Sequence, residues 1–182
     1  MWKLISFSLY KWQFARFGNN TFISNPLAIY GSESISIGHN VFIRDGIRLE
    51  AINNDNSELT ISIGNNVNIE QNVHIAAHHF IQIEDNVSIA GHCSIVDIIH
   101  PYDDLCERGR IGDRISPKYT PVKIGKGTML GFGVHINPGV TIGKNCVVGA
   151  HAVVVNDIPD FSIAAGVPAI VIKRRMQKLT SG

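Results

Sequence analysis

A six-residue period of large apolar residues runs through most of this chain of 182 residues. A second apolar series, which begins with Ile35, Val41 and Ile47, precedes it by two residues and gives the local alternation typical of strands. Glycine and asparagine recur between the apolar residues, and both tolerate the backbone of tight turns. The pattern predicts short strands, each followed by a turn. The main series forms six blocks of three: Phe17-Ile23-Ile29, Ile37-Ile43-Leu49, Ile63-Ile69-Ile75, Ile83-Ile89-Ile95, Ile124-Leu130-Ile136 and Ile142-Val148-Val154.

Every break in this period follows the third member of a block. At the first four block boundaries the separations are 8, 14, 8 and 29 residues instead of 6. If three hexads make one coil, all the insertions leave from the same corner. The spacing therefore predicts an all-β fold, a three-sided parallel solenoid with eighteen residues per coil. The spacing does not determine the hand of the coil, and the general rule for parallel crossovers is right-handed.

The same period divides the chain. Residues 17–175 are expected to form the solenoid domain, with one long loop excursion over residues 97–121. The segment 156–175 leaves the period, and its apolar and then basic end suggests a last strand or short helix that closes the coil. Residues 176–182 are expected to be a tail.

Residues 1–16 are expected to form a short amphipathic helix, because Trp2, Ile5, Leu9 and Trp12 fall at spacings of three and four. The stretch is too short and too interrupted by lysine and arginine for a signal peptide or a transmembrane span. Two interpretations stay open. The helix packs on the solenoid as a cap, or it contacts a membrane surface or a membrane-bound glycolipid.

Composition narrows the class of partner. The chain is 45% hydrophobic and 17% charged, which is typical of a globular domain, and a net charge of +1 gives no argument for nucleic acid. Its three cysteines show neither a zinc spacing nor a disulfide framework. We therefore expect a reducing, cytoplasmic setting.

Three motifs resemble the hexapeptide-repeat acyltransferases. They are Ile136-Asn137-Pro138-Gly139-Val140-Thr141-Ile142-Gly143, Asp157-Ile158-Pro159 followed by Ala164-Ala165-Gly166-Val167-Pro168-Ala169, and His100-Pro101 ahead of the loop. The likeness covers roughly residues 17–175 and is greatest to the maltose, galactoside and nodulation O-acetyltransferase branch, which includes transferases of surface-polysaccharide assembly. It implies a left-handed parallel β-helix, a homotrimer with active sites between subunits, and acetyl-CoA as the acyl donor.

The resemblance assigns His100 as the general base, because histidine can remove a proton from an attacking hydroxyl near neutral pH. Asn72 matches an asparagine that positions the acceptor, although an ordinary turn asparagine is an equal interpretation. His78 and His79 stand where galactoside enzymes carry acidic residues. The acceptor site is expected to include Asn72, His79 and Asp97, and Asp97 could orient the ring of His100.

The donor site follows from the same resemblance, with the pantetheine arm along the later coils. The backbone N–H of Phe132 is the candidate oxyanion donor. A tryptophan common in the branch is here Met129, a lysine is Asn156 and an arginine is Ile170, so the basic run from Lys173 could supply the charge for the CoA phosphates. The expected donor-site residues are Met129, Gly131, Phe132, Gly149, Ala150, Ala165 and Lys173.

The resulting hypothesis is an acetyl-CoA-dependent O-acetyltransferase that acts on a sugar or polysaccharide hydroxyl by direct transfer, with no metal. One alternative is N-acetylation of an amino or nucleotide sugar. A zinc enzyme of the carbonic anhydrase kind is another, with His39, His74 and His79 as ligands. The third is a catalytically silent scaffold, against which His100 and the Ala-Ala-Gly-Val-Pro tail both argue.

Overall fold

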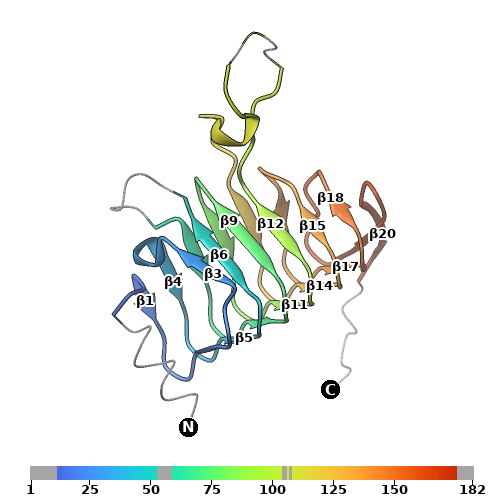
Figure 1. The fold of residues 1–182 in the computed structure, drawn as a ribbon. Coiled ribbons are helices and arrows are strands. Elements are labelled where there is room, and N and C mark those ends of the chain that lie inside the picture. The colour runs from blue at the N-terminus through green and yellow to red at the C-terminus, as the bar shows by residue number, and fades with distance from the viewer. Residues whose placement is uncertain (1–11, 53–58, 104–105, 107, 176–182) are drawn as a thin grey trace, which may run out of the picture.

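The chain winds into a three-sided parallel solenoid in a computed structural model that describes residues 12–52, 59–103, 106 and 108–175 (Figure 1). Within these ranges, two single 3-10 turns, η1 (Ser32–Ser34) and η2 (Ile111–Asp113), are the helical elements. The first sheet contains, in spatial order, β1 (Arg16–Phe17), β4 (Ile35–Ile37), β7 (Ile61–Ile63), β10 (Ile81–Ile83), β13 (Val122–Ile124) and β16 (Thr141–Ile142).

The other two sheets complete the triangular cross-section. The second contains β2 (Phe22–Ile23), β5 (Phe42–Ile43), β8 (Asn68–Ile69), β11 (Ser88–Ile89), β14 (Met129–Leu130), β17 (Val147–Val148), β19 (Ser162–Ala165) and β20 (Ile170–Arg174). The third contains β3 (Ala28–Tyr30), β6 (Arg48–Ala51), β9 (His74–Ala77), β12 (Ser94–Val96), β15 (His135–Ile136) and β18 (Val153–Val154). One coil thus contributes one strand to each sheet, as the period predicts.

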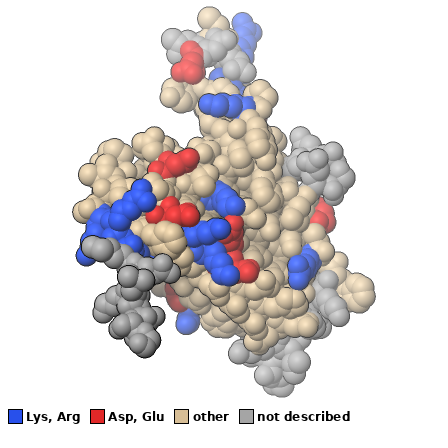
Figure 2. Space-filling view, turned by 180° about the vertical axis from the view of Figure 1, so that it is seen from behind, with Lys and Arg blue, Asp and Glu red and all other residues tan. Residues whose placement is uncertain are grey.

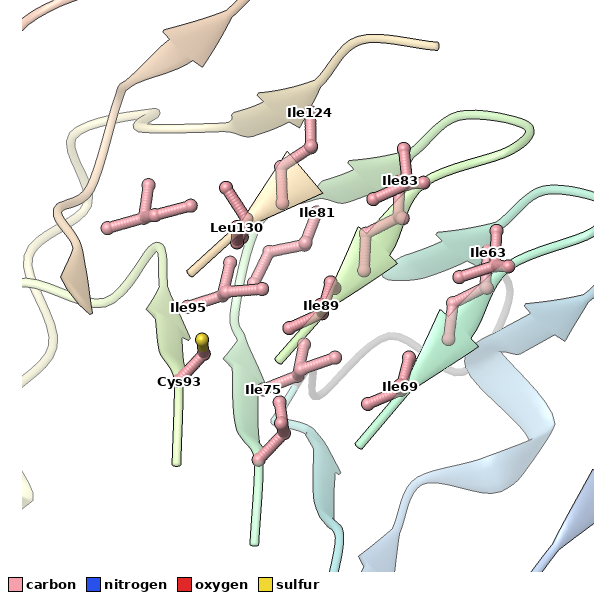
Figure 3. Close-up of a cluster of buried hydrophobic side chains, with 14 of the residues drawn as sticks. Ile63, Ile69, Ile75, Ile81, Ile83, Ile89, Cys93, Ile95, Ile124 and Leu130 are labelled. Atoms are coloured by element: carbon pink, nitrogen blue, oxygen red, sulfur yellow. The ribbon is translucent and has the colours of Figure 1, made fainter. Parts of the chain in front are cut away.

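The core is the stack of hexad side chains along the axis of the coil (Figure 3). In the first sheet, for example, Ile63, Ile83 and Ile124 are paired in register and are almost completely buried. All residues of the main series are buried except Ile29, which is partly buried and packs against the core. Because each coil is covered only by its neighbours, burial of this stack is what holds the coils together.

The corner between the first and second sheets is turned by a ladder of asparagines. Asn20, Asn40, Asn66 and Asn86 all have left-handed backbone, with φ between 55° and 60°. The side-chain amides of the first three each donate to the Oδ1 atom of the asparagine in the next coil, at 2.9, 3.1 and 3.2 Å. Asparagine serves here because it tolerates this backbone and satisfies its own polar groups coil to coil.

The insertions leave from the corner that joins the third sheet to the first. The longest lies between β12 and β13 and projects from the solenoid as the loop at the top of Figure 1. β12 ends at Val96 and β13 begins at Val122, so this excursion occupies the interval given by the break in the period.

The end of the chain closes the solenoid with strands. Ile158 bridges to Ile142 of the first sheet, and β19 pairs with β17 in the second sheet. β20 then turns back and pairs antiparallel with β19. The Val153 N–H of the third sheet donates to the carbonyl of Gly166 at 3.0 Å, so the segment reaches all three sheets.

The helix expected over residues 1–16 does not include residues 12–16. Residues 1–11 lie outside the described residues. From Trp12 onward the chain makes a turn and a bend, and Arg16–Phe17 already form β1 against β4. Phe14 and Phe17 are buried in the core of the first coil, so this part of the chain follows the solenoid and not the helical spacing. The expected tail, residues 176–182, lies outside the described residues too.

The face shown in Figure 2 mixes both signs of charge, with Lys and Arg interspersed among Asp and Glu. Ion pairs of this kind include Lys123 with Glu84 and, on the second sheet, Arg44 with Glu70, each at 2.8 Å. This face therefore presents no single-sign field of the kind that nucleic acid requires. None of the helical elements in the described ranges is long and apolar enough to cross a membrane.

Candidate active site

His100 lies at the root of the loop and is exposed. Its Nδ1 atom is 2.7 Å from the carbonyl oxygen of Arg114. A carbonyl oxygen can only accept, so Nδ1 carries a proton, and in the neutral ring Nε2 then has the free lone pair. That is the form a general base requires.

The two arms of the loop are joined below His100. The Ser116 N–H donates to the carbonyl of Ile99 at 2.9 Å, and the Thr120 hydroxyl donates to the carbonyl of Asp97 at 2.7 Å. With the pair between His100 and Arg114, these contacts tie the rising and descending arms at three levels. The imidazole is therefore carried on ordered backbone rather than on the loop tip.

Asp97 has a different role from the one expected. Its side chain is fully buried, and its carboxylate accepts the backbone N–H groups of His78, His79 and Phe80 at 2.7, 3.0 and 2.7 Å. Burial raises the pKa of the Asp97 carboxyl, although the three N–H donors favour the ionised form. Since its oxygens are enclosed, Asp97 holds the turn that precedes β10 and is not available to contact a substrate or to orient His100.

His79 lies where that turn meets the loop. Its ring packs edge-on against Tyr119 at 5.4 Å between centroids and against His78 at 4.8 Å. Tyr119 is in the descending arm of the loop and is exposed. His79 therefore sits beside the loop that carries His100, and Asp97 fixes its backbone.

Asn72 lies at a different corner, between the second and third sheets. It is exposed, has left-handed backbone with φ 56°, and its Nδ2 atom donates to the Nε2 atom of His92 at 3.3 Å. The contact from His92 was not expected from the sequence. The signal was nevertheless present, because Asn72 and His92 each precede an inward isoleucine by three residues.

Four of the expected donor residues, Gly131, Gly149, Ala150 and Ala165, form a strip of small residues over neighbouring coils. A Cβ on Gly131 would lie 2.6 Å from the nitrogen of Ala150, and a Cβ on Gly149 would lie 2.9 Å from the Cβ of Ala165. Within the described part of the chain, the backbone N–H groups of Phe132 and Ala150 have no hydrogen-bond acceptor. A strip without side chains, flanked by unpaired N–H groups, suits an extended amide-containing arm.

Two further donor-site residues lie on the second sheet. Met129 begins β14 and is about half exposed beside the strip, where a flexible apolar side chain can cover a ligand. Lys173 is exposed on β20 and is paired with Ile163 of β19. The structure thus places Gly131, Gly149, Ala150 and Ala165 side by side on the second sheet, whereas Lys173 lies two strands away from β17.

The expected base and the donor strip lie on different parts of one chain. The loop with His100 leaves the corner between the third and first sheets, whereas β14 and β17 belong to the opposite, second sheet (Figure 1). A single chain therefore does not assemble the whole expected site.

The outer face of the third sheet carries a row of polar residues that was not identified from the sequence, formed by Arg48, Glu50, His74, Ser94 and His135. Glu50 is nearly buried and accepts from Arg48 at 2.7 Å and from His74 at 3.0 Å. Ser94 is paired in register between His74 and His135 on the neighbouring strands. Despite burial, the bonds from Arg48 and His74 leave the pKa of Glu50 below its usual value. Except for Glu50, each residue of this row directly precedes an inward residue of the hexad series, so the repeat could have predicted its position.

The histidines of the zinc alternative are not brought together. His39 accepts the Asn19 N–H at 2.9 Å, His74 is bonded to Glu50, and His79 packs on Tyr119. Among the described residues there is no group of three histidine, cysteine or acidic side chains placed to hold a metal.

Comparison with known proteins places the chain in a family. A family profile described as bacterial transferase hexapeptide, six repeats, matches residues 121–156. The chain is 32% identical over 160 residues to the putative lipopolysaccharide biosynthesis O-acetyl transferase WbbJ of Escherichia coli K12, covering 86% of this chain and 80% of that protein. The chain belongs to the hexapeptide-repeat acetyltransferases, and its parallel solenoid is their left-handed β-helix.

Two other similarities bear on the substrate class. The galactoside O-acetyltransferase of Escherichia coli K12 is 33% identical over 168 residues, which is 91% of this chain, and the chain spans 66% of the length of that relative. A point mutant of AntD, an N-acyltransferase from Bacillus cereus, is similar in structure with a TM-score of 0.78 and 26% identity. That match covers 94% of this chain and 89% of AntD, whose structure contains dTDP-4-amino-4,6-dideoxyglucose and coenzyme A.

Proposed function

We propose that this protein is an acetyl-CoA-dependent O-acetyltransferase that acts on a hydroxyl of a sugar or polysaccharide unit. The observation that carries the proposal is the bond from His100 to Arg114, which leaves one ring nitrogen able to accept a proton. The O-acetyltransferase relatives WbbJ and galactoside O-acetyltransferase support the reaction, and the coenzyme A in the AntD structure supports the donor.

The transfer is direct. The Nε2 atom of His100 takes the proton of the acceptor hydroxyl as its oxygen attacks the thioester carbonyl. The carbon–sulfur bond then breaks, and the leaving sulfur takes the proton from the imidazolium, which gives CoA and the acetyl ester. The N–H of Phe132 is the proposed donor to the negative charge that develops on the carbonyl oxygen.

The active site is proposed to form between subunits of a homotrimer. His100 and the donor strip belong to different corners of the coil, so a neighbouring chain must supply one of them. Two residues are the proposed acceptor contacts. Asn72 lies at the corner beside the donor strip, and His79 lies beside the loop. The cytoplasmic setting stays a prediction, as does membrane contact through residues 1–16.

The test is release of CoA from acetyl-CoA across a panel of free sugars, oligosaccharides and nucleotide sugars. His100→Ala should lower the turnover rate by about 10²- to 10⁴-fold, the usual contribution of a positioned base. His39→Ala is the matched control, because His39 lies in the second coil and contacts Asn19 and Arg16. A His100→Ala protein as active as the wild type would refute the proposal.

N-acylation of an amino-sugar nucleotide is the second candidate, because of the similarity to AntD. The same panel separates the two. Transfer to a 4-amino nucleotide sugar with none to hydroxyl acceptors would establish the second candidate and reject the first.

A further inference from the structure

The corner between the second and third sheets is turned by left-handed residues in successive coils. One of them is His92, with φ 61°. Glycine and asparagine adopt this backbone more readily, so the turn alone gives no reason for a histidine at this position. The residues of this corner are Asn25, Gly46, Asn72, His92, Gly133 and His151.

The Asn72 carboxamide lies between His92 and Gly46. Its Nδ2 atom lies 3.3 Å from the Nε2 atom of His92. A carboxamide nitrogen can only donate, so Nε2 of His92 accepts. On the other side the Oδ1 atom of Asn72 lies over Gly46, where an added Cβ would collide with it.

The other side of the His92 ring meets the donor site. Its centroid is 4.9 Å from the ring of Phe132, tilted by 43°, and Phe132 is 43% exposed. The backbone keeps these coils in step, since the His92 N–H donates to Gln71 and the Gly133 N–H donates to Gly91, both at 3.0 Å. His92 therefore touches one residue on the acceptor side and one on the donor side.

We propose that His92 is a positioning residue that fixes the orientation of the Asn72 carboxamide. One N–H of the amide donates to His92, and among the described residues the Asn72 amide nitrogen has no second side-chain acceptor. The remaining N–H is therefore left for an oxygen of the acceptor. This inference rests on the proposed function, in which Asn72 contacts the acceptor.

Two variants separate the hydrogen bond from the ring. His92→Asn fits the left-handed backbone, and asparagines bond from coil to coil at 2.9 to 3.2 Å in the ladder of the neighbouring corner. His92→Gly fits the backbone equally well, as Gly46 and Gly133 show, but removes both contacts. Both variants lose the contact between the His92 ring and Phe132, so any effect of that loss on the KM for acetyl-CoA should be the same in both.

The readout is the KM for the acceptor, measured with the best substrate of the panel. His92→Gly should raise it by about three- to tenfold, the equivalent of one hydrogen bond, while His92→Asn stays within about twofold of the wild type. An unchanged acceptor KM in His92→Gly would overturn the inference. An equal rise in both variants would do so too, since the hydrogen bond would then not be the cause.

A wild-type protein that transfers to no acceptor would reject the proposed function instead. In that case crystal structures of the two variants decide on His92. A carboxamide of Asn72 that is displaced in His92→Gly and kept in His92→Asn would support the positioning role. An unmoved carboxamide in His92→Gly would refute it.

Discussion

The Nδ1 atom of His100 donates to the carbonyl oxygen of Arg114 at 2.7 Å, across the root of the loop. The contact sets the tautomer of the ring. It also joins the two arms of the loop, so the proposed base is oriented by backbone and needs no carboxylate partner. Because the donor strip is on another face of the coil, the proposed mechanism requires a second chain beside His100.

Subunit mixing tests this arrangement. His100→Ala and Asn72→Ala trimers should each be poorly active, and unfolding and refolding them together at equal concentration should restore about a quarter of wild-type activity, because one site in four receives both intact residues. The measurement is CoA release before and after mixing. Activity that stays at the level of the single variants would place His100 and Asn72 in the same site of one chain.

Asp97 should matter for stability. Asp97→Ala removes the acceptor of three backbone N–H groups at His78, His79 and Phe80. We expect the thermal midpoint to fall by about 5 to 10 °C, since each unpaired enclosed donor destabilises the fold. The check is a melting curve followed by circular dichroism.

Asp160→Ala is the control for Asp97→Ala. The Asp160 carboxylate is exposed and accepts one N–H, that of Lys144, at 2.7 Å. Its loss should lower the midpoint by less than about 3 °C, because water can replace an exposed acceptor. Equal effects of the two variants would contradict the role given to Asp97.

Gly46→Ala should impair use of the acceptor. Gly46 has φ 79°, and its Cβ would push on the Oδ1 atom of Asn72. Gly127→Ala introduces the same kind of strain, with φ 70° and a Cβ that meets Asn145, at a corner away from Asn72. Both should be destabilised by about 1 kcal/mol. A rise in acceptor KM is expected for Gly46→Ala alone, and a rise in both would mean that strain and not Asn72 is responsible.

The Glu50 carboxylate gives a pH dependence with a defined sign. Its pKa in the folded protein is lowered, so the ionised form is favoured by folding. The stability that it contributes is present above its unfolded pKa, near 4.5, and is lost as the pH falls through the lower folded value. The difference in unfolding midpoint between the wild type and Glu50→Gln should therefore shrink as the pH is lowered below 4.5. A difference that grows on acidification would be contrary to this account.

Sequence periodicity was sufficient for the framework because the hexad is a local signal. Ile63, Ile83 and Ile124 are separated by 20 and 41 residues, yet their positions in the repeat alone bring them into register. The same rule could have placed His92 beside Asn72. The three backbone partners of Asp97 could not be obtained in this way, because they lie in the break of the period between Ile75 and Ile83, where the repeat gives no register.

Residues 12–16, the end of the expected N-terminal helix, show the converse limit. Spacings of three and four in a short apolar stretch fit a helix, but Phe14 and Phe17 lie in the core of the first coil. Burial against the next coil decides the conformation there, and local spacing contains no information about that neighbour.

The corner that receives all the insertions has a consequence for divergence within the family. At the other two corners, stacked left-handed residues fix the number of residues per coil, so a change of length there would move buried side chains out of register. At the loop corner the chain can lengthen or shorten while every inward residue keeps its place. The length of the loop that carries His100 can therefore change while the stacked core of the coil stays in register.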